Sequence, residues 1–138
     1  MSERKAQQSL ENLKKALTRL EEALQEKDTN SLYIDGTIQR FEFTFELFWK
    51  TVKRLLQMEG IETKTPRETL KHAYSVKWLK NEQAWLQMLR DRNETSHLYD
   101  EAKAKQIYEN IKGYFPELND TFIDLSEKYG DSGSDDES

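Results

Sequence analysis

The sequence predicts an all-α protein, an up-and-down bundle of four helices with an additional short helix. Three observations support this fold class. Apolar residues recur at steps of three and four, the 138 residues include two prolines and five glycines, and no long run of alternating Val, Ile and Thr is present. A chain of this length suits one domain with its own core, which we expect to cover residues 1–130.

The first predicted helix runs from Glu3 to about Gln25. Its leucines alternate steps of three and four residues, which places a narrow apolar stripe on an otherwise charged helix. The stripe consists of Leu10, Leu13, Leu17, Leu20 and Leu24. The polar segment 28–31 interrupts the pattern, and any of its last three residues is suited to cap the next helix.

The second predicted helix, about Leu32 to Glu59, has a stronger seam and is expected to be the central core helix. The seam residues are Ile34, Ile38, Phe41, Phe45, Phe48, Val52 and Leu55. Phe43, Leu47 and Met58 fall on the opposite side, where a monomer would carry polar groups. This second apolar surface either binds a partner or a second copy of the chain, or is covered by another helix of the same bundle.

Two further helices follow Gly60, which ends the second one. The segment Thr65–Glu68 has the pattern of a capping box with proline at the first helical position, so we expect a short helix to about Tyr74. Asn81 is suited to cap the next helix, which we expect over residues 82–96.

The last part of the chain is predicted to form two helical stretches and a tail. Asp100 is a candidate N-cap for a helix that reaches Lys112, and Pro116 is expected to start a separate final stretch. After Gly130 the segment 131–138 is polar and acidic, and we expect it to be disordered.

Composition limits the chemistry that the chain can perform. The sequence has no cysteine and two histidines, so we expect no disulfide, thiol catalysis, metal site or cofactor. The charged N-terminus and the lack of a long apolar run predict a cytoplasmic protein without a membrane span. The net charge of -5 includes four acids in the last eight residues, so the remainder carries -5 + 4 = -1. Basic residues gather in the middle third of the chain: Lys71, His72, Lys77, Lys80, Arg90 and Arg92. They form either a patch that binds RNA or an ordinary solvated helix face.

The most informative segment runs from Arg92 to Tyr99 and reads Arg-Asn-Glu-Thr-Ser-His-Leu-Tyr. A guanidinium holds a phosphate through a planar fork of donors, and an imidazole such as that of His97 exchanges protons near neutral pH. The apolar stripe of residues 85–89, continued along the helix, meets Arg92, Asn93 and Ser96. We therefore expect these polar residues to face inward, with an acid of the second helix as the counter-charge of the arginine: Asp35, Glu42 or Glu46.

Arg92 and His97 are five residues apart, which separates them by about 140° on an ideal helix. One straight helix would therefore not direct both side chains at one atom. Either the helix ends or bends near Thr95, or a second copy of the chain completes the site across a two-fold axis.

The spacing Arg92-Asn93-(three residues)-His97 resembles the signature of the HEPN superfamily of small helical bundles. With Tyr99 added, it resembles HepT-like toxins paired with minimal nucleotidyltransferase antitoxins, a branch also called nucleotidyltransferase substrate-binding proteins. The segments 39–50 and 85–91 carry the resemblance beyond the motif. It covers roughly residues 8–128.

The resemblance implies a metal-independent ribonuclease toxin whose site forms at a homodimer interface. Arg92 and His97 would be the catalytic residues, Asn93 would support them, and the partner nucleotidyltransferase would silence the RNase by transferring AMP to Tyr99. The alternative is a non-catalytic subunit that binds a nucleotidyltransferase and its substrate through the basic patch and the surface around Phe43 and Leu47. A structural dimer without a nucleotide role is a third interpretation. The structural alternatives for the single residues are that His97 caps or packs at a helix end, that Tyr99 is a core aromatic with its hydroxyl at the rim, and that Arg92 forms a buried ion pair with an acid of the second helix.

Overall fold

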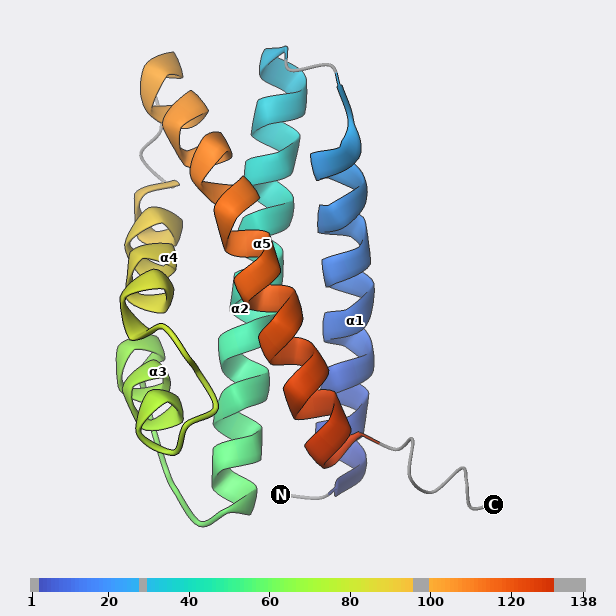
Figure 1. Cartoon of the computed structure of the whole chain (residues 1–138), viewed down its shortest axis with the longest axis vertical. Helices are drawn as coiled ribbons and strands as arrows, with labels where there is room; N and C mark the ends of the chain where they lie inside the picture. The colour runs from blue at the N-terminus through green and yellow to red at the C-terminus, as the bar shows by residue number, and fades with distance from the viewer. Residues whose placement is uncertain (1–2, 28–29, 96–99, 131–138) are drawn as a thin grey trace.

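The computed structural model describes residues 3–27, 30–95 and 100–130, and this part of the chain consists of helices and their connections without a strand. The helices are α1 (Glu3–Gln25), α2 (Ser31–Met58), α3 (Pro66–Ser75), α4 (Glu82–Glu94) and α5 (Glu101–Tyr129). Helices α1 and α2 run antiparallel, α5 crosses them obliquely, and α3 and α4 lie one above the other along the flank of α2 (Figure 1). The predicted bundle of four helices with one short addition is confirmed.

The core is built around α2, as its apolar seam predicts. All seven seam residues are buried, and the three phenylalanines among them have no exposed surface. The leucine stripe of α1 packs onto this seam, with Leu13 and Leu20 fully buried. Burial of this continuous stripe is the main favourable contribution to folding because it removes apolar surface from water over the whole length of the bundle.

Helix starts follow the local sequence closely. Each N-cap residue accepts a hydrogen bond from a backbone N–H two or three residues later, at 2.9 to 3.2 Å. These caps are Asn30, Thr65, Asn81 and Asp100. Asn30 is therefore the cap among the three candidates that precede α2. Gly60 directly follows Glu59, the C-cap residue of α2. Its φ of 83° is a conformation that glycine adopts without the steric penalty of a side chain.

The predicted break at Pro116 is wrong, because α5 continues through the proline as one helix. Proline removes one helical hydrogen bond and crowds the preceding turn. One buried stripe of α5 nevertheless keeps its spacing of three and four residues across the proline: Ile107, Ile111, Tyr114, Leu118, Thr121 and Leu125. Pro116 itself lies on the exposed side. Packing of this stripe outweighs the local cost of the proline.

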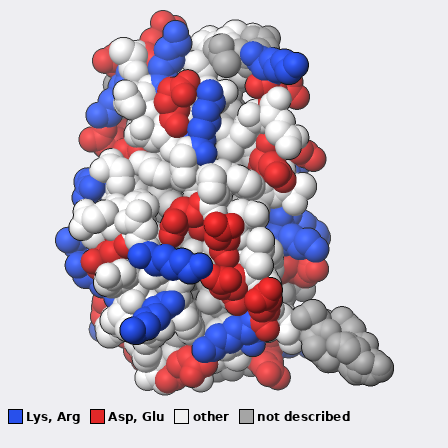
Figure 2. Space-filling model, in the orientation of Figure 1, with Lys and Arg blue, Asp and Glu red and all other residues white. Residues whose placement is uncertain are grey.

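Charged side chains of both signs are interspersed over the face of the bundle in Figure 2. Within the described ranges, none of the helices combines the length and apolar character needed to cross a bilayer. The acidic segment 131–138 lies outside the described residues, so its predicted disorder stays a prediction.

Candidate functional site

Helix α4 presents the first half of the motif, and Trp85 anchors this helix. Its indole has no exposed surface and meets the Phe48 ring edge-on at a centroid distance of 4.9 Å. Its Nε1–H also donates to Glu117 Oε2 at 3.1 Å. Trp85 therefore ties the first half of α4 to both α2 and α5.

Arg92, in the last turn of α4, forms an ion pair with Glu46 of α2. Its Nη2 lies 3.1 Å from Glu46 Oε1, and each side chain keeps 33% of its surface exposed. Glu46 is therefore the counter-charge among the three acids proposed from the sequence. Partial burial acts to raise the pKa of Glu46. The charge and hydrogen bond of Arg92, a hydrogen bond from Trp49 and the charge of Lys50 outweigh it, so this pKa lies below its ordinary value.

Helix α4 ends at Glu94, and Thr95 connects that end to α2. The Thr95 hydroxyl donates to a carboxylate oxygen of Glu42 and also approaches the Arg92 carbonyl oxygen at 2.7 Å. Glu46 and Glu42 of α2 therefore contact two residues of the motif, Arg92 and Thr95 respectively. Of the two geometries considered from the sequence, the helix end near Thr95 is confirmed, and this leaves a contribution from a second copy open.

The prediction that Asn93 faces inward is wrong, because Asn93 lies on the exposed side of α4. Successive residues are rotated by about 100° on a helix, so Asn93 cannot share the direction of Arg92. Asp91 is the inward polar residue of this turn, with 6% of its surface exposed. Its carboxylate accepts hydrogen bonds from Tyr114 and Asn110 of α5 and from Gln87.

Sequence reasoning missed Asp91 because its partners on α5 lie 19 and 23 residues further along the chain. The helical spacing from Gln87 to Asp91 was the available local signal, since residues four apart are neighbours on a helix.

The second half of the motif, residues 96–99, lies outside the described residues. The roles expected for His97 and Tyr99 therefore stay predictions, as does the inward direction of Ser96. What the structure establishes is the placement of Arg92, which faces α2 immediately before the end of α4.

The second apolar surface of α2 is partly covered. Leu47 and Met58 are half-buried and pack against the core, whereas Phe43 keeps 61% of its surface exposed. Phe43 precedes Glu46 by three residues and Leu47 follows it by one, so an apolar strip lies beside the Arg92–Glu46 pair. A partner docked on this strip would therefore lie next to the motif.

The predicted basic patch is divided by ion pairs. Lys71 Nζ lies 3.3 Å from Glu82, and Lys80 Nζ lies 3.6 Å from Asp124. Over the described ranges, no group of three or more His, Asp or Glu side chains is arranged to hold a metal ion.

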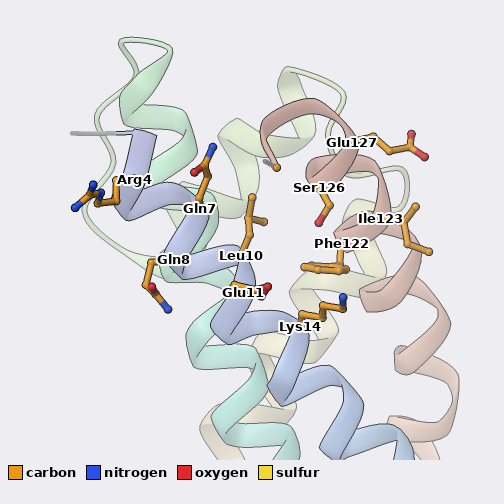
Figure 3. Close-up of a pocket in the computed structure, with 11 residues that line it drawn as sticks. Arg4, Gln7, Gln8, Leu10, Glu11, Lys14, Phe122, Ile123, Ser126 and Glu127 are labelled. Atoms are coloured by element: carbon orange, nitrogen blue, oxygen red, sulfur yellow. The ribbon is translucent and has the colours of Figure 1, made fainter. Parts of the chain in front are cut away.

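A groove lies elsewhere, between the start of α1 and the end of α5 (Figure 3). Leu10, Phe122 and Ile123 supply apolar side chains, and charged groups of both signs surround them. The end of α4, with Arg92, lies toward the opposite end of the bundle (Figure 1). The groove therefore does not belong to the motif site.

Comparison with known proteins agrees with this fold. Residues 8–127 match the family described as nucleotidyltransferase substrate binding protein like, a range that includes the whole motif. A probable ribonuclease HepT of Haemophilus influenzae is 35% identical over 89 aligned residues. The alignment spans 61% of the length of that relative and 61% of this chain.

Two solved structures share the fold. A crystal structure of a Thermus thermophilus protein superposes with a TM-score of 0.78 at 33% identity, covering 82% of this chain and 98% of the other. A Haemophilus influenzae protein, described as having the fold of a substrate binding domain of a nucleotidyltransferase, superposes with a TM-score of 0.74 at 29% identity. That match covers 84% of this chain and 98% of the other. With the family match over most of its length, this chain belongs to the nucleotidyltransferase substrate binding protein-like family.

Proposed function

We propose that this protein is a HEPN-type endoribonuclease, the toxin of a toxin–antitoxin pair that is controlled by a minimal nucleotidyltransferase. The observation that carries the proposal is Arg92, a partly exposed guanidinium held by Glu46 at the end of α4, a few residues before the motif histidine. The relationship to a probable ribonuclease HepT supports the same activity.

The proposed reaction needs no metal ion. The ribose 2′-oxygen attacks phosphorus, the bond from phosphorus to the 5′-oxygen breaks, and a cyclic phosphate and a 5′-hydroxyl result. The His97 of one copy takes the proton of the attacking hydroxyl, and the protonated His97 of the second copy gives its proton to the leaving oxygen. Arg92 neutralises the negative charge that develops on the phosphate. Asn93, on the exposed side of α4, supports the substrate rather than the core.

A homodimer supplies the second motif. The strip formed by Phe43 and Leu47 lies beside the Arg92–Glu46 pair, so a two-fold axis on this strip brings the two copies of Arg92 to one interface. A symmetric interface uses the same surface of both chains, and the exposed ring of Phe43 supplies the apolar contact that such an interface buries.

Tyr99 is the proposed point of control. A nucleotidyltransferase forms a bond between the Tyr99 oxygen and the α-phosphorus of ATP, and pyrophosphate leaves while a base accepts the phenol proton. The attached adenylate adds negative charge and bulk two residues beyond His97. Both effects would exclude the RNA phosphate from the neighbouring site.

The alternative function is a non-catalytic subunit that binds a nucleotidyltransferase and its substrate. It is favoured by the description of the family and of the Haemophilus influenzae structure as substrate-binding. In this case the strip at Phe43 and Leu47 would receive the nucleotidyltransferase, and the isolated chain would not cleave RNA.

Cleavage of RNA by the purified protein in EDTA tests the proposal. We expect wild-type protein to cleave and His97→Ala to be inactive. His72→Ala is a matched control, because His72 is the other histidine of the chain and lies exposed on α3. Absence of cleavage by folded wild-type protein, or cleavage that stops in EDTA and returns with magnesium, would refute the proposed mechanism.

A further inference from the structure

Asp91 is the one charged side chain that is buried in the described part of the chain. A buried carboxylate is costly unless hydrogen bonds and charges compensate for the water that it loses. The proposed reaction assigns Asp91 no role, although it immediately precedes Arg92. A retained buried charge beside the motif therefore calls for an explanation.

Three donors satisfy the Asp91 carboxylate. Tyr114 Oη donates to Oδ2 at 2.5 Å, Asn110 Nδ2 donates to the same oxygen at 3.0 Å, and Gln87 Nε2 donates to Oδ1 at 3.1 Å. Burial, together with the hydrogen bond and the charge of Asp91, raises the pKa of Tyr114. The phenol therefore remains protonated, and remains a donor, over the neutral range.

These bonds control the rotation of the last turn of α4. Asp91 and Arg92 are consecutive, so their side chains leave the helix about 100° apart. With Asp91 directed at α5, Arg92 points toward α2, where Glu46 receives its guanidinium. A rotation of this turn would move both side chains together.

The first half of α4 does not depend on Asp91. Trp85, almost two turns earlier, is fixed by Phe48 and Glu117. Loss of the Asp91 bonds would therefore release the last turn of α4 while the helix stays docked. This separation makes the role of Asp91 testable without unfolding the bundle.

We propose that Asp91 is a positioning residue that fixes the last turn of α4 against α5 and so aims Arg92 at the phosphate site. The proposal rests on the proposed ribonuclease function for its effect on catalysis. The geometric part, the aim of Arg92, concerns the folded protein alone and is measured separately.

Two substitutions test the two sides of the contact. Asp91→Asn keeps the shape of the side chain but removes one acceptor, and Tyr114→Phe removes one of the two donors that α5 supplies. Tyr108→Phe is the matched control, because Tyr108 is a buried tyrosine of the same helix that does not bond to Asp91. Unfolding midpoints and circular dichroism establish that each variant is folded.

The first readout is the titration of the Glu46 carboxyl followed by NMR, which needs no RNA. Among the residues that the structure describes, Arg92 and Lys50 are the cations that face Glu46. If Arg92 turns away in Asp91→Asn, the pKa of Glu46 rises toward its ordinary value, with a smaller rise in Tyr114→Phe and none in Tyr108→Phe. A residue that only stabilises the fold would lower the unfolding midpoint without moving this titration, and that result would overturn the proposal.

The second readout is RNA cleavage. We expect kcat/KM to fall by about 10²-fold in Asp91→Asn, because displacing a catalytic group by about 1 Å has an effect of that size. Unchanged cleavage in a folded Asp91→Asn variant would also overturn the positioning role. If wild-type protein cleaves no RNA, the proposed function fails, whereas the Glu46 titration still decides whether Asp91 aims Arg92.

Discussion

Replacing Arg92 by Gln should separate catalysis from stability. The Arg92–Glu46 ion pair is 3.1 Å long, and one third of each side chain is exposed. Water screens a pair of this kind, so its loss should reduce the free energy of unfolding by no more than about 1 kcal/mol. Loss of a group that stabilises transition-state charge typically slows a reaction by about 10²–10³-fold. Arg92→Gln should therefore remain folded and lose almost all cleavage.

Urea unfolding and RNA cleavage rates, measured on the same preparation, provide the assay. Arg90→Gln is the control, because Arg90 lies two residues earlier on the exposed side of α4 and bonds to Gln87 of the same helix. A loss of several kcal/mol in Arg92→Gln would show that the arginine is mainly structural. Cleavage within a few-fold of wild type in a folded variant would refute its assignment to the phosphate.

Three further predictions concern pH, assembly and the proline of α5. The folded-state pKa of Glu46 lies below its ordinary value of 4.5. Urea unfolding should therefore show wild type to be more stable than Glu46→Gln above pH 4.5, and this difference should disappear as the pH falls through the folded-state pKa. Phe43→Asp should dissociate the proposed dimer with little loss of stability, because the ring is 61% exposed; an unchanged sedimentation coefficient would remove Phe43 from the interface. Pro116→Ala should raise the free energy of unfolding by up to about 3 kcal/mol, because it restores a helical N–H donor at an exposed position; a lower unfolding midpoint would contradict this.

Much of the fold follows from local patterns. The leucine spacing of α1 and the seam of α2 predict which faces are buried, because one helix face meets the core at every turn. Side chains such as Asn81 and Asp100 mark helix starts, since each satisfies a backbone N–H within its own first turn. These features depend on residues close together in the sequence.

The remaining features depend on distant contacts. A local rule predicts a break at Pro116, but burial of a stripe on both sides of it keeps α5 continuous. Asp91 is buried because α5 supplies its donors, and Glu46 is distinguished from the other α2 acids by its contact with Arg92. Sequence periodicity gives the direction of a side chain along a helix but does not show which neighbour it meets there.

Transfer of AMP to Tyr99 tests the central claim most directly. The protein, its minimal nucleotidyltransferase and ATP are incubated together, and peptide mass and RNA cleavage are measured on the same sample. The account predicts one adenylate on the Tyr99 peptide and loss of cleavage in parallel, with Tyr99→Phe active and resistant to silencing. Tyr74→Phe, at an exposed tyrosine of α3, should behave as wild type. Tight binding of the nucleotidyltransferase without modification of Tyr99, together with no cleavage by the isolated chain, would contradict the account and establish the substrate-binding subunit in its place.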